Sequence, residues 1–287
     1  MLYRITHTTR YAYPSLVTQC FTEVRLKPRA MPGQQLREYA LEVNPVPAFL
    51  QERRDYFGNE VSTFAVFERH DRFAATASSV VEVQPRNGEL YPSPTWESVR
   101  DLLAVPLDRE SIAAAEYIFD SPFISTFGGL RQYASSIFTP ARPLLSAVEE
   151  LTRRIHDEFT YQSRSTRIDT PLSEILLNRR GVCQDFAHLM IGALRSYGLS
   201  ARYVSGYIRS GPRLQGAAAS HAWVAVFDPK NGWLGFDPTN NMCTSDAHIT
   251  LAWGRDYGDV TPVKGLTVGG NGQSVEVDVR VQPLAEV

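Results

Sequence analysis

The first 83 residues carry short apolar and polar alternations of the kind that form β-strands. Segments rich in β-branched and aromatic residues predict strands at 3–13, 18–26, 37–43, 61–67 and 74–83. Turn-forming stretches around Pro28 and Gly58 separate them. Several antiparallel strands at this spacing predict a small N-terminal β-sandwich.

Beyond residue 88 the apolar positions recur with a helical period. The stretch 84–95 breaks both periods with Pro85, Gly88, Pro92 and Pro94, so we place a domain boundary there. Helical patterns follow at 96–103, 110–119, 143–159, 171–178 and 183–197, and strand patterns at 201–208, 221–227, 233–237 and 275–281. The predicted fold class is α+β, with a sandwich over 1–88 and a second domain over 89–287. Its core should span about 142–260, with a late strand at 274–282.

Composition and charge narrow the class of protein. The 287 residues are 43% hydrophobic and 21% charged, as in ordinary globular proteins. A balance of 29 Lys+Arg against 31 Asp+Glu gives a net charge of −2, which draws the chain to neither nucleic acid nor an anionic membrane. The sequence begins without a basic segment followed by an apolar one, and it has no run of 18 apolar residues. We therefore expect a cytoplasmic protein without nucleic-acid or membrane partners; the sequence leaves the oligomeric state open.

Three cysteines are too few and too irregularly spaced for a disulfide framework. Cys20, Cys183 and Cys243 include no Cys-x-x-Cys pair, which also argues against a zinc knuckle. A reducing compartment fits this pattern, and we expect neither a metal nor a cofactor.

Cys183 has the sequence context of an activated thiol. It lies three positions before Phe186, on the face that the predicted helix buries, and Gly181 interrupts the chain just before it. Unpaired N–H groups and the positive end of the helix dipole would stabilise a thiolate and an oxyanion there. A thiol with a pKa of about 8.5 is only a few per cent thiolate at pH 7, so such activation matters. The alternative is a buried, inert cysteine.

His221 and Asp237 are the candidate base and its orienting partner. His221 opens an apolar strand, and Asp237 closes the next one, where Pro238 ends ladder pairing. If Asp228 faces Gly232 across the hairpin, Asp237 faces Trp223 and becomes a diagonal neighbour of His221, about 7–8 Å away at Cα. This register requires a left-handed residue in the loop, for which Gly232 is suited. A plain four-residue loop would place the two side chains on opposite faces.

These motifs together resemble the transglutaminase-like superfamily of papain-type thiol enzymes. The resemblance rests on Gly181-Val182-Cys183, His221-Ala222-Trp223 and Asp237-Pro238-Thr239, in this order. Segments 3–11, 23–28 and 254–260 resemble the N-terminal β domain and C-terminal segment of bacterial members. The resemblance implies a papain-like core of helices on an antiparallel sheet, with Cys183 as nucleophile, His221 as base and Asp237 as orienter.

The same resemblance implies cleavage or transfer of an amide or peptide acyl group through a thioester. Hydrolysis is favoured because the sequence has no apparent acceptor-binding module; protein cross-linking is the alternative. The tryptophan that serves the oxyanion hole of animal transglutaminases has no clear match, so Tyr161, Gln184 and Trp223 are the candidates for oxyanion or substrate contacts. No acidic loop of the calcium-binding type is present.

Two other functions remain open from the sequence. The fold could serve a non-catalytic binding protein, although all three side chains of the triad are present. Cys183, His221 and Asp237 could instead bind a metal, although soft and hard ligands without paired spacing disfavour this. His188 fits packing better than catalysis, and Cys243 is expected to be structural.

Overall fold

The computed structural model describes residues 1–86, 88–209, 215 and 220–284. Its first part is an antiparallel sheet in the strand order β2-β5-β1-β4-β3. The strands are β1 (Leu2–Val24), β2 (Gln34–Asn44), β3 (Phe49–Arg54), β4 (Glu60–Val66) and β5 (His70–Val83). The predicted N-terminal antiparallel β unit is confirmed, although hydrogen bonding joins all its strands into one continuous sheet.

β1 is one long strand where the sequence predicted two. The predicted strands 3–13 and 18–26 are continuous through Pro14, with a register shift between Ala12 and Val17. Proline is tolerated at such irregularities because no ladder hydrogen bond is needed there. The first half of β1 pairs with β5 and the second half with β4. Inward-facing residues of both halves contribute to one apolar cluster, which includes Tyr13, Val17, Cys20, Val24, Phe64 and Phe73.

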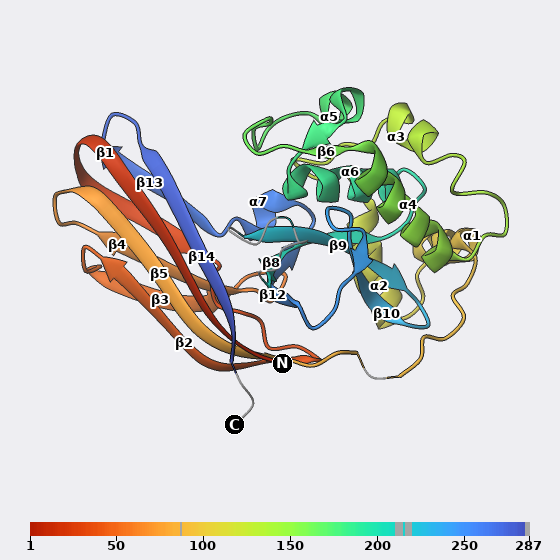
Figure 1. Ribbon diagram of the computed structural model, residues 1–287, viewed down its shortest axis with the longest axis horizontal. Helices are drawn as coiled ribbons and strands as arrows, with labels where there is room; N and C mark the ends of the chain where they lie inside the picture. The colour runs from red at the N-terminus through yellow and green to blue at the C-terminus, as the bar shows by residue number, and fades with distance from the viewer. Residues whose placement is uncertain (87, 210–214, 216–219, 285–287) are drawn as a thin grey trace.

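Two strands from the end of the chain complete this sheet. β13 (Val263–Gly269) and β14 (Ser274–Leu284) both pair with β1, so that Leu2 lies opposite Leu284 and Cys20 opposite Thr267. Figure 1 shows these blue strands beside the red β1. The structure thus differs from the expected division into 1–88 and 89–287. The late strand exists, but it belongs to the first sheet, where β13 and β14 pair with the edge of β1 opposite β4 and β5.

The second unit packs helices on a five-stranded antiparallel sheet, as predicted. The sheet order is β11-β10-β9-β8-β12. Its strands are β8 (Ala201–Ile208), β9 (His221–Asp228), β10 (Gly232–Asp237), β11 (Met242–Cys243) and β12 (His248–Gly254). The helices are α1 (Trp96–Ala104), α2 (Arg109–Ala115), α3 (Gly128–Tyr133), α4 (Leu144–Glu158), α5 (Leu172–Asn178), α6 (Cys183–Arg195) and α7 (Tyr257–Val260). Within the described ranges, no helix combines the length and apolar character that a bilayer crossing requires.

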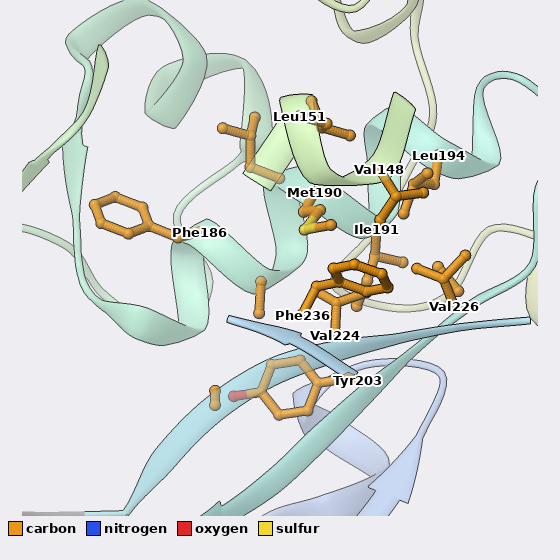
Figure 2. Packing of buried hydrophobic residues seen from close by; sticks show 14 of the residues in the cluster. Val148, Leu151, Phe186, Met190, Ile191, Leu194, Tyr203, Val224, Val226 and Phe236 are labelled. Atoms are coloured by element: carbon orange, nitrogen blue, oxygen red, sulfur yellow. The ribbon is translucent and has the colours of Figure 1, made fainter. Parts of the chain in front are cut away.

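Helix α6 is the centre of this unit. Its residues are buried almost without interruption from Asp185 to Arg195, because it lies between other helices and the sheet. Figure 2 shows Met190 and Ile191 of α6 between the α4 side chains and Val224 of β9. A helix covered on several sides is held firmly, and so is the residue at its start.

Side-chain amides of the first unit close the free edge of the second sheet. Gln34 donates to the Thr250 carbonyl (2.8 Å) and accepts from the Thr250 N–H (2.7 Å). Asn59 makes the same two-way pair with the backbone of Trp253, at 2.9 and 3.0 Å. Each amide thereby substitutes for one residue of a neighbouring strand, and the outer edge of β12 is paired rather than open.

Candidate active site

The β9–β10 hairpin has the register that the sequence predicted. Asp228 pairs with Gly232 and Phe236 with Val224, and Gly232 adopts the expected left-handed conformation at φ +71°. The Asp228 carboxylate stabilises the turn by accepting from the backbone N–H groups of Lys230 (2.8 Å) and Asn231 (3.0 Å). The predicted parity is confirmed, and it places His221, Trp223 and Asp237 on one face of the sheet.

The segment between the two units holds this hairpin in place. The Ser93 hydroxyl donates to the Asp228 carboxylate (2.6 Å), and Asn231 exchanges two hydrogen bonds with the backbone of Tyr91, at 2.9 and 3.0 Å. Both turn residues are buried as a result. The stretch 84–95, which reads as a linker in the sequence, is therefore also a support for the strands that carry His221 and Asp237.

His221 and Asp237 form a buried hydrogen-bonded pair. His221 Nε2 lies 2.7 Å from Asp237 Oδ2, and both side chains are completely inaccessible to solvent. His221 Nδ1 is buried and has no hydrogen-bond partner among the described residues. Since Nε2 is occupied by Asp237, Nδ1 is the ring nitrogen left to act on another group.

Cys183 occupies the position predicted for it, at the first residue of α6. The Asp185 carboxylate accepts from the Val182 N–H (2.8 Å) and from the Thr166 hydroxyl (2.6 Å), which fixes the helix start against the preceding loop. Gly181 is required here because a Cβ would lie 2.7 Å from Asp185 Oδ2. The Cys183 side chain remains half-exposed and so accessible to a substrate.

The electrostatics couple the three side chains. Burial alone would lower the pKa of His221, but the Asp237 charge and hydrogen bond outweigh it, and with the nearby Cys183 they raise this pKa to about 10. Burial would likewise raise the pKa of Asp237, yet the His221 charge and the hydrogen bonds from His221, His248 and Asn240 hold it well below its usual range. The pair is therefore an imidazolium and a carboxylate at neutral pH, with Cys183 beside the imidazolium.

The side chains of two further residues contact the Asp237 carboxylate, and sequence reasoning missed both. Asn240 donates to Oδ2 through its side chain (2.7 Å) and to Oδ1 through its backbone N–H (3.2 Å). His248 Nε2 lies 3.4 Å from Oδ2. Asn240 is only three residues after Asp237, so the contact could have been predicted from the sequence as an Asx-type turn. No local pattern predicts the contact of His248, since this residue lies on a different strand.

The three candidates for oxyanion or substrate contacts lie in different surroundings. Tyr161 pairs with Gly181 across the short strands β6 (Thr160–Tyr161) and β7 (Arg180–Gly181), and burial followed by the charge of Cys183 raises its pKa. Gln184 is half-exposed in the first turn of α6. Trp223 is 3% exposed and packs edge-on against His248. In this position the indole packs against the histidine of β12, and the predicted oxyanion or substrate contact of Trp223 stays a prediction.

His188 is a packing residue, as expected. Its ring stacks on Phe123, and its Nε2 accepts from the Tyr257 N–H (3.1 Å). Burial lowers the pKa of His188 to about 3. The neutral ring thus connects α6 to the start of α7.

We expect His188 to make the fold sensitive to acid. Because its pKa is about 3 in the folded state and 6.5 when unfolded, the unfolded chain binds more protons between these values. Stability that is complete above pH 6.5 is therefore lost as the pH falls towards 3. His188→Gln keeps an acceptor for Tyr257 and should lose about 2 kcal/mol less than the parent between pH 7 and 5 in urea denaturation. Equal losses in both proteins would contradict this.

A metal site built from Cys183, His221 and Asp237 is the other alternative that the sequence leaves open. In the structure, Asp237 occupies Nε2 of His221, which leaves Nδ1 as the ring nitrogen without a partner among the described residues. Among the described residues, no group of three or more His, Cys, Asp and Glu side chains has the geometry to hold an ion.

The structure places a thiol at a helix start and a buried imidazole–carboxylate pair at the ends of two neighbouring strands, and the comparisons with known proteins identify the class of the chain. Residues 131–238 match the transglutaminase-like superfamily, and residues 3–82 match the bacterial transglutaminase-like N-terminal region. The chain belongs to the transglutaminase-like superfamily.

Individual relatives place the chain more closely. An uncharacterised protein of Mycobacterium tuberculosis is 39% identical, with 98% of this chain and 93% of that protein aligned. A protein-glutamine gamma-glutamyltransferase of Pseudomonas aeruginosa is 33% identical over only 34% of this chain and 16% of its own length. A solved structure from Cytophaga hutchinsonii, described as a candidate cysteine protease, covers 100% of this chain and 92% of its own at 22% identity and a TM-score of 0.80. That likeness establishes the shared fold across both units.

Proposed function

We propose that this protein is a thiol enzyme that cleaves amide or peptide bonds through a thioester on Cys183. The observation that carries the proposal is the buried His221, whose Nε2 is held by Asp237 at 2.7 Å and whose Nδ1 is left for Cys183. An imidazolium fixed in this way stabilises a neighbouring thiolate and can then supply a proton.

In the first half of the reaction, the Cys183 sulfur attacks the carbonyl carbon of the substrate. A C–S bond forms, and the carbonyl oxygen becomes an oxyanion that the N–H groups at the start of α6 can stabilise. The C–N bond then breaks as His221 gives its Nδ1 proton to the departing amine. A thioester on Cys183 and a neutral His221 remain.

In the second half, water attacks the thioester carbon while His221 takes its proton. The C–S bond breaks, the carboxylic acid leaves and the thiolate–imidazolium pair is restored. A primary amine in place of water would give a new amide through the same steps. We favour water for this chain, and the name of the Pseudomonas aeruginosa relative makes amine transfer the second candidate.

Alkylation of the cysteines tests the activated pair. Cys183 should react with iodoacetamide at a nearly constant rate from pH 8 to 6, because the raised pKa of His221 keeps the imidazolium charged across this range. Cys243 is an internal control in the same molecule: it is exposed, and partial desolvation and the Glu149 charge raise its pKa, so its labelling should fall steeply. Peptide mass spectrometry separates the two sites. A Cys183 rate that falls like an ordinary thiol, titrating near pH 8.5, would sink the proposal and favour the non-catalytic binding protein.

Incubation with a glutamine-containing peptide library separates hydrolysis from transfer. With and without a fluorescent primary amine, we expect free carboxylates to be the main products in both samples. If the amine is incorporated into most of the product, the reaction is transamidation and not hydrolysis. The proposed roles of Cys183, His221 and Asp237 would be the same.

A further inference from the structure

His248 meets the Asp237 carboxylate from a strand that is not its neighbour in the sheet. It is the first residue of β12, is 4% exposed, and places Nε2 3.4 Å from Asp237 Oδ2. Oδ2 is also the oxygen that binds His221 Nε2. Two histidine rings therefore share one carboxylate oxygen.

The proton on the neutral His248 ring is fixed by its other nitrogen. Nδ1 accepts from the Ser245 backbone N–H (3.2 Å) and so carries no proton itself. The neutral ring must then carry its proton on Nε2, from which it donates to Asp237. His248 thus donates a hydrogen bond to Asp237 and does not compete with His221 for a proton.

The surroundings hold the ring in this orientation. Trp223 packs edge-on against His248, with ring centroids 5.2 Å apart. Space for Trp223 comes from Gly206, where a Cβ would lie 2.4 Å from the indole and 2.1 Å from the Ile249 carbonyl. The titratable groups brought against His248 are Asp237 from β10 and His221 from β9.

We infer that His248 is a positioning residue that acts on Cys183 and His221 only through Asp237. During the proposed cycle His221 alternates between charged and neutral, and its own hold on Asp237 weakens when it is neutral. Donors from His248, Asn240 and the Thr239 backbone (2.9 Å) keep the carboxylate ionised and unrotated during that interval. The inference rests on the proposed function and adds a residue that supports the site without touching substrate.

Substitution of His248 in the full chain tests this. His248→Phe removes the donor and keeps a planar ring, so Cys183 alkylation at pH 6 should slow by about tenfold relative to pH 8, the factor expected for one hydrogen bond to a charged group. His248→Gln retains an N–H donor and should stay within about threefold of the parent by the same reasoning. His70→Gln is the matched control, because His70 is also buried in a sheet, and within the described part of the chain its ring bonds to the Glu68 carbonyl alone.

Each outcome decides a different question. An unchanged pH dependence in His248→Phe, or an equal loss in all three variants, would overturn the role of His248 and reduce it to packing. A parent protein in which Cys183 titrates as an ordinary thiol would overturn the proposed function instead. If His248→Phe does not fold, ¹⁵N spectra of the histidines in the parent still decide: the proton is expected on Nε2, and an Nδ1-protonated ring would contradict the inference.

Discussion

Replacing Cys183 by alanine should abolish amide turnover, with a loss of at least about 10⁴-fold, because the variant cannot form the thioester and residual binding alone contributes little. The fold should be unaffected. The Cys183 side chain is half-exposed, and the helix start is fixed by Asp185 and Gly181 independently of the sulfur. Progress curves on a substrate found by library screening give the rates, and thermal unfolding reports the fold.

Cys243→Ser is the matched control for this loss. Cys243 lies on β11 and pairs with Phe236 of β10, the strand that carries Asp237. It is therefore near the His221–Asp237 pair without being part of it. We expect its serine variant to keep parental turnover. Loss of activity in Cys243→Ser together with retention in Cys183→Ala would exchange the roles of the two cysteines and refute the assignment.

A fragment that begins at residue 89 should fail to fold, although the sequence suggests a boundary there. Without β1, the strands β13 and β14 have no partner in the first sheet. Without Gln34 and Asn59, the edge of β12 loses four hydrogen bonds to side chains. Unpaired strand edges promote aggregation, so we expect insoluble material and no cooperative transition by circular dichroism.

A second fragment separates these two causes. Residues 89–262 end before β13 and expose only the β12 edge, so this fragment should be more soluble than 89–287 and still less stable than the whole chain. Co-expression of residues 1–88 with 89–287 should restore solubility by re-forming the pairs with β1. A fragment 89–287 that folds by itself with parental stability would contradict the interdependence of the two units.

Local patterns were enough to predict the parts of the site that are close in sequence. The loop from Asp228 to Gly232 specifies its own turn through the Asp228 carboxylate and a left-handed glycine, which sets the register that brings His221 and Asp237 together. The start of α6 was readable because Gly181 and the apolar period beginning at Cys183 act over a few residues. Such features depend on neighbouring residues and so leave a trace in the sequence.

Long-range pairing left no such trace. The residues of β13 and β14 do not specify β1 as their partner, since a strand of alternating polar and apolar residues can pair with any strand edge of suitable pattern. His248 shows the same limit. Three strand spacings separate β12 from β10 in the sheet order, about 14 Å in a flat sheet, so contact with Asp237 requires the sheet to curl. The curl is a property of the whole sheet, and no short segment encodes it.

The pairing of β1 with strands that follow the entire second unit also has a consequence for synthesis in the cell. When β1 leaves the ribosome, β4 and β5 soon cover one of its edges, but its other edge waits for Val263–Gly269 and Ser274–Leu284. At 5–20 residues per second this wait is on the order of 10 s or more. The nascent chain thus carries an open strand edge throughout the translation of the candidate active site, and this is the interval in which we expect it to depend most on chaperones.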